Sequence, residues 1–271
     1  MSIAAKRELS RMQSLQNPRV RIVADDPREP GEAPIGASFL SGREVHVWHA
    51  RLEDLAPAEE LAGLLSAEEL GRARSFYQRS RQEIYIRAHG TLRQVLSAYA
   101  GLSPGTIQYG YAAYGKPYLA NARDDRKVRF NMSHDGQSVS YIVSGDEEVG
   151  IDAEQADPAF DWRPIARAYF APEENSFLES LPEDRRHYAF CWIWTRKEAL
   201  LKADGAGLSA IDRCETNAMR PRIGPFALST WELAPDYPCS CAVGPKVEQA
   251  IVMRLLRKRN PSMEVMGLER I

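Results

Sequence analysis

The chain alternates between helical and extended patterns twice, and this order limits it to folds that combine helices with sheets. Apolar residues at three- and four-residue spacings predict a helix from Ile84 to Tyr99, with Gly101 at its C′ position. Short segments rich in β-forming residues follow at 107–111, 128–131, 139–143 and 149–152. Helical patterns return at 165–169, 172–181 and 184–202, and a strand pattern returns at 226–233. The sequence therefore predicts an α/β (α+β) fold in two halves.

The organisation along the chain suggests two halves of similar size between a lead-in and a tail. The expected boundaries are 1–41 for an N-terminal extension, 42–147 and 148–245 for the halves, and 246–271 for a C-terminal tail. The extension carries four prolines and no alternating apolar segment before Val45, so we expect it to be partly disordered. Each long helix leads to a Gly-Leu-Ser tripeptide, at 101–103 and 207–209, which is a weak echo of duplication.

Composition excludes several classes of protein. Hydrophobic residues make up 44% and charged residues 27%, which is typical of a soluble globular protein. A net charge of −2 lacks the basic excess of a nucleic-acid-binding protein, and no apolar run approaches the ~20 residues that cross a bilayer. The four cysteines form no C-x-x-C pair, and the first fifteen residues hold no continuous apolar segment. We expect a cytoplasmic protein without nucleic-acid or membrane partners.

The motif G-I-D-A-E places two carboxylates at the end of an expected strand. Asp152 and Glu154 are two positions apart, so both side chains project from the same face of that strand. Adjacent carboxylates repel each other unless a cation joins them, and Mg²⁺ commonly uses one or two carboxylates together with phosphate oxygens and water. The pair thus suggests a Mg²⁺ site, and a polar strand end that faces water is the alternative.

The motif W-T-R-K-E-A-L-L-K places three side chains on one stripe of an expected helix. Trp194, Glu198 and Lys202 are spaced by four, so a carboxylate and an ammonium face the same way beside an aromatic ring. The alternative is an ordinary surface pair that stabilises the helix by roughly 0.3 kcal/mol, with the aromatic residue in the core.

Two further motifs lie in the first half. In F-N-M-S-H-D-G, Phe130 and Met132 alternate as in a buried strand, and Ser133 and His134 come where that strand ends. A Ser-His-Asp hydrolase is disfavoured because adjacent strand residues point to opposite faces and cannot easily share a proton. The Y-G-K-P motif predicts a rigid turn that holds Lys116 in a fixed place.

Taken in order, these motifs resemble the signature of the Sfp-type 4′-phosphopantetheinyl transferase superfamily. The resemblance covers residues 45–235 and includes an arginine-rich helix pair at 74–93, the four motifs above, F-x-x-x-E at 170–174, and G-x-G-L at 205–208. It implies a pseudo-two-fold fold of two similar halves, each with a small sheet packed by helices. It also implies an enzyme that transfers the 4′-phosphopantetheine group of coenzyme A to a serine of an apo carrier protein or carrier domain, releasing adenosine 3′,5′-bisphosphate.

The resemblance assigns roles to the charged residues of the second half. Asp152, Glu154 and Glu198 would hold the Mg²⁺ that bridges them to the pyrophosphate of coenzyme A. Glu198 would also be the catalytic base, acting directly or through a water, and Lys202 would be the second catalytic group, within reach of the pyrophosphate. Lys197 is a further candidate cation for coenzyme A.

By the same resemblance, Arg72, Lys116, Ser133 and His134 would bind coenzyme A, chiefly through its phosphates. The chain departs from the family at Glu69, where a basic residue is common. That glutamate has a local explanation, because S-A-E-E places it three residues after a serine in a capping box that opens a helix. The 3′-phosphate would then rely on the arginines that follow, which are Arg72, Arg74 or Arg79.

The implied partners are coenzyme A and the apo carrier protein or carrier domain of a fatty-acid, polyketide or non-ribosomal peptide synthase, and a monomer is expected. Two other functions stay open: a non-catalytic relative that only binds coenzyme A or a carrier, and a Mg²⁺-dependent enzyme that uses water as the acceptor. The products separate these hypotheses, because the three functions yield modified protein, nothing, and free phosphopantetheine respectively.

Overall fold

The computed structural model describes residues 21–28, 41–122, 127–205 and 217–255. Its helices are α3 Ala58–Leu61, α4 Ala67–Ser75, α5 Arg79–Ala100, α6 Arg163–Tyr169, α7 Pro172–Ser180 and α8 Glu183–Asp204. Single 3₁₀ turns occur at Leu52–Asp54, Ala62–Leu64 and Pro104–Thr106. The helices expected from the apolar spacings are therefore confirmed. Both long helices contain 22 residues and end at a glycine in the left-handed region, Gly101 and Gly205.

The strands form two larger sheets and one hairpin. The five-stranded sheet has the order β1-β11-β2-β6-β5, with β1 Arg21–Arg28, β2 Glu44–Arg51, β5 Arg129–His134, β6 Ser138–Ser144 and β11 Gln249–Leu255. The four-stranded sheet has the order β7-β10-β9-β8, with β7 Val149–Ala153, β8 Arg222–Ile223, β9 Phe226–Ala234 and β10 Tyr237–Val243. The hairpin pairs β3 Tyr109–Tyr111 with β4 Pro117–Leu119.

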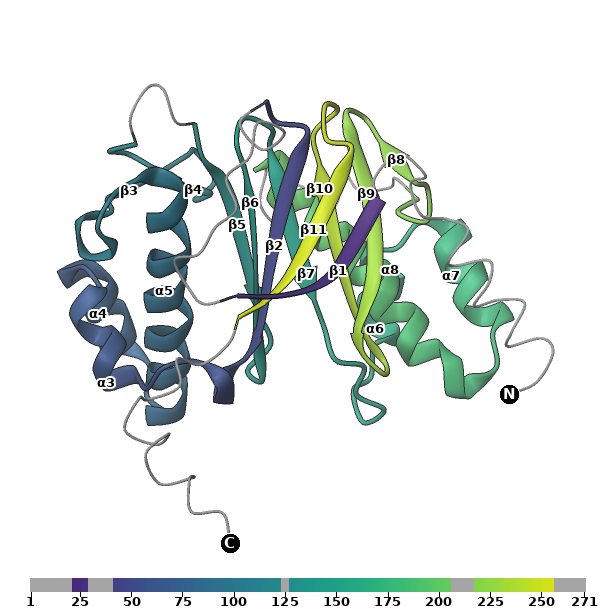
Figure 1. Ribbon diagram of the computed structural model, residues 1–271. Coiled ribbons are helices and arrows are strands. Elements are labelled where there is room, and N and C mark those ends of the chain that lie inside the picture. Colours follow the sequence, from purple (N-terminus) through teal and green to yellow (C-terminus); the bar gives the residue numbers. More distant parts are fainter. Residues whose placement is uncertain (1–20, 29–40, 123–126, 206–216, 256–271) are drawn as a thin grey trace, which may run out of the picture.

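Helices cover the outer faces of the two sheets, and the helices of the two halves lie on opposite sides of the strands (Figure 1). α5 packs on one face of the five-stranded sheet through Trp48 and Tyr141. The other face shares a core with the four-stranded sheet, which includes Val47 and Ile151. α8 then covers the four-stranded sheet around Leu228. The protein is thus a mixed α+β structure in which small sheets pack against helices.

The strands at the two ends of the chain differ from the sequence prediction. β11 lies between β1 and β2 and runs parallel to both, so parts of the expected extension and tail belong to the five-stranded sheet. Local composition could not reveal this pairing, because it joins segments more than two hundred residues apart. The expected small sheet is also divided, since β5 and β6 lie in one sheet and β7 in the other. The second Gly-Leu-Ser tripeptide, 207–209, lies outside the described residues.

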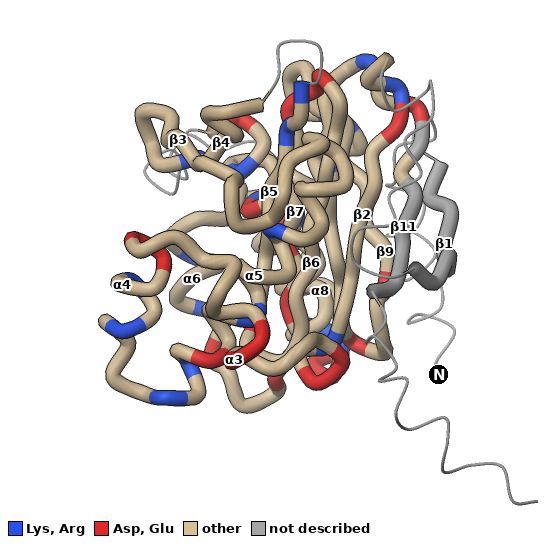
Figure 2. The backbone as a smooth tube through the Cα atoms, turned by 60° about the vertical axis from the view of Figure 1, so that its left-hand side comes forward, with Lys and Arg blue, Asp and Glu red and all other residues tan. Residues whose placement is uncertain are grey.

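Charge is spread over the described chain rather than gathered in one element. Acidic and basic residues are interspersed among the helices and strands (Figure 2), in keeping with the nearly balanced total. Within the described ranges, no helix combines the length and apolar character needed to cross a membrane.

The two halves meet where the edge strands β5 and β7 lie side by side. The side chain of Asn131 on β5 accepts a hydrogen bond from the backbone N–H of Ile151 on β7, at 3.1 Å. An amide side chain thus satisfies a backbone donor that a paired strand would otherwise satisfy. This contact fixes β7 relative to the first half.

A glycine allows α8 to approach β7 closely. A Cβ atom added to Gly150 would overlap the carbonyl oxygen of Ala199 and lie 2.5 Å from the backbone nitrogen of Ala203. Since no side chain separates helix and strand here, residues that follow on β7 lie directly against the next turn of α8. The close crossing therefore positions Asp152 two residues further along the strand.

Replacing Gly150 by alanine should force α8 away from β7. We expect G150A to lower the free energy of unfolding by about 1–3 kcal/mol, as overpacking of a buried contact usually does. The matched control is G71A in α4, where an added Cβ meets nothing within 4 Å and a better helix former should stabilise by up to about 1 kcal/mol. Urea unfolding measures both, and a G150A protein as stable as the wild type would contradict the close crossing.

Candidate active site

The structure brings together the charged residues of β7 and α8. Asp152 lies near the end of β7, Glu154 follows directly after that strand, and Glu198 and Lys202 lie one turn apart on α8. The ammonium of Lys202 donates a hydrogen bond to Oδ1 of Asp152, with 2.6 Å between nitrogen and oxygen. The predicted proximity of the G-I-D-A-E and W-x-x-K-E-A-x-x-K motifs therefore exists in the fold.

Asp152 is held from the first half as well. The hydroxyl of Ser133, on β5, donates to the same oxygen, Oδ1, at 2.7 Å. The side chain of Asp152 is only 4% exposed, and its other oxygen, Oδ2, is buried with no hydrogen-bond partner among the described residues. One carboxylate oxygen is thus fully engaged while the other is left free and desolvated.

Like charges surround this aspartate. Burial raises the pKa of Glu154 from its ordinary value of 4.5 to about 8, and the charges of Asp152, Asp135 and Glu198 add to the effect while Lys202 opposes it. Burial also raises the pKa of Glu198, again reinforced by Asp152 and opposed by Lys202. The site therefore contains more negative charge than one lysine can neutralise.

Lys202 keeps its own charge in this setting. Burial works against its ammonium, but Asp152, Glu198 and Glu154 outweigh burial and raise the pKa of Lys202 above its ordinary value. A lysine with a raised pKa is protonated throughout the physiological range. It supplies one fixed positive charge next to three carboxylates.

These residues fit a Mg²⁺ ion with few protein ligands. Among the described residues, no three histidine, cysteine, aspartate or glutamate side chains are grouped so that they could hold a metal ion by themselves. Mg²⁺ does not require a preformed set of protein ligands, because it keeps water and phosphate oxygens in its shell. The unpartnered Oδ2 of Asp152 and the mutually repelling Glu154 and Glu198 are the features that a divalent cation would satisfy.

The remaining residue of the predicted aromatic and charged stripe, Trp194, is partly buried at the edge of the core. Its ring stacks against Phe170 and Phe190 at centroid distances of 6.5 and 6.0 Å. It also lines a pocket together with Glu154, so it lies between the core and the site.

His134 follows Ser133 but serves a different face. Its side chain is exposed, whereas Ser133 is buried and donates its hydroxyl hydrogen bond to Asp152 rather than to the imidazole. Partial burial of the ring lowers the pKa of His134, and the charge of Lys202 adds to this shift. The Ser-His-Asp hydrolase that the sequence disfavoured has no geometric support here.

Lys116 is fixed between the halves and away from the carboxylates. Its ammonium donates to Oε2 of Glu148 at 2.6 Å and to the carbonyl oxygens of Ala203 and Val149, at 2.8 and 3.3 Å. These three bonds use all of its donors, and a cation at Ala203 is also favoured by the C-terminal end of α8. The Y-G-K-P turn holds Lys116 in a fixed place, as predicted, but the ammonium is bonded to other groups of the protein.

Lys197 is not part of the site, so its prediction as a ligand of coenzyme A is corrected. Its side chain is completely buried and pairs with Glu174, which is also completely buried, at 2.8 Å. Because successive residues of a helix are rotated by about 100°, the side chain of Lys197 points away from that of Glu198 and into the core between α7 and α8. The F-x-x-x-E motif could have indicated this pairing, because its glutamate, Glu174, would need a cation nearby if it were buried.

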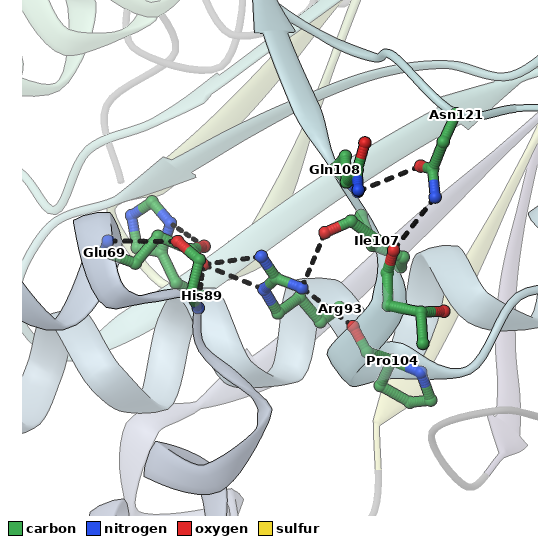
Figure 3. A network of polar contacts seen from close by, with 9 residues as sticks. Glu69, His89, Arg93, Pro104, Ile107, Gln108 and Asn121 are labelled. Carbon is green, nitrogen blue, oxygen red and sulfur yellow. Dashed lines mark hydrogen bonds and ion pairs between the residues drawn. The ribbon is translucent and has the colours of Figure 1, made fainter.

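Glu69 has the structural role that its capping box indicated. Ser66 and Glu69 exchange both capping hydrogen bonds at the start of α4. Oε2 of Glu69 also accepts two bonds from Arg93, at 2.7 and 2.9 Å, and the same guanidinium donates to the carbonyl oxygens of Pro104 and Ile107 (Figure 3). This glutamate therefore joins α4 to α5 and to the loop that follows, and it supplies no positive charge.

Arg72 lies on the exposed side of α4, and its guanidinium has no ion pair within the described residues. Its charge influences the ionisation of Tyr85, His89 and Tyr111, which places these rings around it. Burial lowers the pKa of His89 to about 4, so that this histidine is neutral at physiological pH. Arg72 is therefore an exposed cation of α4 that lies beside these rings.

Two pockets include candidate site residues, one Glu154 and the other His134. A pocket of about 270 Å³ is lined by Glu154, Gln155, Asp157, Phe160, Ile165, His187, Phe190, Cys191 and Trp194. A second pocket, of about 310 Å³, is lined by Phe76, Arg81, Ile84, Tyr85, His134, Asp135 and Gly136. The sequence analysis did not anticipate Arg81 or Asp135. Asp135 is nineteen residues before Glu154 in the chain, yet its charge acts on Glu154, and only the fold brings the two together.

Comparison with known proteins identifies the family. The family model described as 4′-phosphopantetheinyl transferase superfamily matches residues 148–244. The chain is also 34% identical to the 4′-phosphopantetheinyl transferase HetI of Nostoc sp. over 216 residues, which is 78% of this chain and 90% of HetI. The chain belongs to the 4′-phosphopantetheinyl transferase superfamily. The predicted family and enzyme class, a 4′-phosphopantetheinyl transferase, are thereby confirmed.

Other relatives of this transferase agree. A 4′-phosphopantetheinyl transferase of Bacillus subtilis is 31% identical over 152 residues, covering 56% of this chain and 65% of the relative. The 4′-phosphopantetheinyl transferase ffp of the same species is 27% identical over 206 residues, covering 72% and 89%. The family model spans the carboxylates of β7 and α8, whereas Arg72, Lys116 and Ser133 lie outside its range.

Removing the buried cation of this transferase should test the correction at Lys197. We expect K197M to lower the free energy of unfolding by about 3–5 kcal/mol, because it leaves Glu174 charged and unpaired in the core. The double variant K197M/E174L should recover much of that loss, and the folded fraction should bind coenzyme A as the wild type does. Normal stability combined with weaker coenzyme A binding would return Lys197 to the site.

The raised pKa of Glu154 predicts a pH-dependent stability in metal-free protein. Because its folded-state pKa of about 8 exceeds the ordinary 4.5, the folded state binds more protons than the unfolded chain between these values. Stability from this group is complete below pH 4.5 and is lost as the pH rises to 8. Urea unfolding in a chelator should show this decline for the wild type and a smaller one for E154Q. Parallel pH profiles for the two proteins would contradict it.

Proposed function

We propose that the protein transfers the 4′-phosphopantetheine group of coenzyme A to a serine of an apo carrier protein or carrier domain, with Mg²⁺ as cofactor and adenosine 3′,5′-bisphosphate as the other product. The observation that carries this proposal is the arrangement at Asp152, whose Oδ2 is buried and unpartnered beside Glu154, Glu198 and a charged Lys202. Membership of the family supports the type of reaction, and the arrangement at Asp152 supports the location of the metal and the pyrophosphate.

The proposed metal ligands are Asp152, Glu154 and Glu198. When bound there, Mg²⁺ would neutralise charge on the pyrophosphate of coenzyme A. The protein's own contribution is a set of carboxylates that are buried, crowded and only partly balanced by Lys202. Such a set has a high proton affinity without metal, so its affinity for a divalent cation should rise with pH as the carboxylates lose their protons.

Glu198 and Lys202 are the proposed catalytic groups. The carrier serine must lose its proton as it attacks phosphorus, and a glutamate with a raised pKa is a suitable base near neutral pH. Lys202 stays protonated one helical turn away, so it can stabilise the negative charge that develops on the departing phosphate. Both groups lie on α8, whose position is set by the contact with Gly150.

The proposed contacts to the rest of coenzyme A are Arg72 and His134, and we propose that Lys116 supports them by keeping its turn rigid. Arg81 and His134 line the same pocket, and Arg72 is exposed on α4, so two arginines and an imidazole that can donate a hydrogen bond are available to phosphate groups. A pseudo-two-fold relation between the halves is supported by the matched 22-residue helices α5 and α8 and by their terminal glycines.

The decisive experiment follows the carrier by mass spectrometry. With coenzyme A and Mg²⁺, several apo carriers of different synthase types are offered, and we expect at least one to gain the mass of phosphopantetheine on serine. E198Q should slow this reaction by about 100- to 10,000-fold, the usual contribution of a general base, and D152A should abolish it.

Other products would favour other functions. Free phosphopantetheine with unmodified carriers would indicate water as the acceptor, and coenzyme A binding with no product would indicate a non-catalytic relative. Either result, obtained with a panel that a known transferase modifies, would overturn the proposal. K246M is a suitable control, because that lysine pairs with Asp146 and Glu147 on the surface, away from the site.

A further inference from the structure

We propose that Ser133 is a positioning residue for the metal-binding carboxylate of Asp152 and not a ligand of coenzyme A. This inference rests on the proposed function, since it concerns the same Mg²⁺ site. Its basis is the 2.7 Å hydrogen bond from the Ser133 hydroxyl to Oδ1 of Asp152, which joins β5 of the first half to β7 of the second.

The bond decides which oxygen of Asp152 faces the ligand. A carboxylate oxygen has two lone pairs, and Oδ1 already accepts from both Ser133 and Lys202, at 2.7 and 2.6 Å. Oδ2 accepts nothing within the described residues, although it is buried. With Oδ1 occupied from two sides the carboxylate cannot rotate without breaking two bonds, so Oδ2 is the oxygen presented to a cation.

The proton inventory argues against a phosphate contact. A serine hydroxyl has one proton to donate, and that of Ser133 is committed to Asp152. Phosphate oxygens of coenzyme A accept hydrogen bonds, so binding one would require Ser133 to abandon a buried carboxylate. Ser133 is also only 8% exposed, whereas its neighbour His134 is exposed and lines the adjacent pocket. His134 can meet a phosphate without disturbing the carboxylate.

The positions of the two donors explain why a serine is needed in addition to Lys202. Lys202 approaches from α8 and belongs to the same half as Asp152, whereas Ser133 approaches from the facing edge strand β5. Asn131, two residues earlier on the same face of β5, makes the neighbouring bond to the backbone of Ile151. The two side chains of β5 thus hold the backbone of β7 and the carboxylate that β7 carries.

The test compares S133A with S133T and with a matched control, S140A. Ser140 is the direct partner of Ser133 on β6, is also buried, and bonds to His49 instead of the site. Mn²⁺ binding is measured by electron paramagnetic resonance with and without coenzyme A, and coenzyme A binding is measured by calorimetry in a chelator. We expect S133A to bind Mn²⁺ about 10- to 100-fold more weakly, as loss of a group that orients a metal ligand usually does.

A positioning role further requires that the other readouts stay constant. Coenzyme A affinity without metal should be unchanged in S133A, and in turnover the metal concentration at half-maximal rate should rise while kcat at saturating metal changes little. S133T keeps the hydroxyl and should restore Mn²⁺ affinity, and S140A should leave it unaltered. If S133A is too unstable to purify, S133C, which nearly keeps the volume but donates weakly, carries the same expectation.

Two results would overturn the inference while leaving the proposed function intact. One is a loss of metal-free coenzyme A affinity in S133A, which would make Ser133 a direct ligand. The other is unchanged Mn²⁺ affinity in S133A and S133C. A wild-type protein that binds Mn²⁺ and coenzyme A but modifies no carrier would instead count against the proposed function alone.

Discussion

The contact between α8 and β7 is the interaction on which the site depends. Helix and strand touch through backbone at Gly150, so Lys202 reaches Asp152 with a 2.6 Å bond. A larger residue at 150 would separate the two elements by the width of its side chain, and the pairing of lysine and carboxylate would lengthen beyond hydrogen-bond range. The roles proposed for Glu198 and Lys202 therefore require a glycine at position 150, where α8 crosses β7.

The site also depends on how the two halves are joined, because Asp152 receives a donor from each. Lys116 spans the halves near one end of β7, binding Glu148 and the last turn of α8. Towards the other end, Tyr237 of β10 bonds to Ser138 and thereby holds β10 against β6. With ties at both ends, the distance between Ser133 and Asp152 is set by the whole interface and not by the flexibility of two side chains.

Local sequence patterns predicted the parts of this structure that depend on neighbours in the chain. The capping box at Glu69, the left-handed glycine after α5 and the shared stripe of Glu198 and Lys202 are all set within four residues, so spacing alone reveals them. The order of the motifs added the family and the identity of the carboxylates. Their physical proximity was an expectation that only the fold could test.

The misses share a different cause, which is dependence on a partner distant in sequence. Lys197 and Lys202 are both lysines of the same helical motif, so the local sequence does not distinguish them. In the fold, Lys197 pairs with Glu174 of α7 in the core, whereas Lys202 pairs with Asp152 at the site. β11 could not be recognised as a central strand because its neighbours β1 and β2 come from the other end of the chain. Residue type and spacing identified which charged residues to consider. Tertiary contacts determined which of them lie at the site and which are paired in the core.

Charge balance links the buried pairs to the site. Lys197 with Glu174, and Arg93 with Glu69, are buried cations each matched to one carboxylate, although Oε1 of Glu69 accepts no hydrogen bond within the described residues. At Asp152 the match fails, since Lys202 faces three carboxylates and one oxygen has no partner. This excess of negative charge lies beside the unpartnered Oδ2 of Asp152, where a divalent cation would balance it and would also bind phosphate oxygens of coenzyme A.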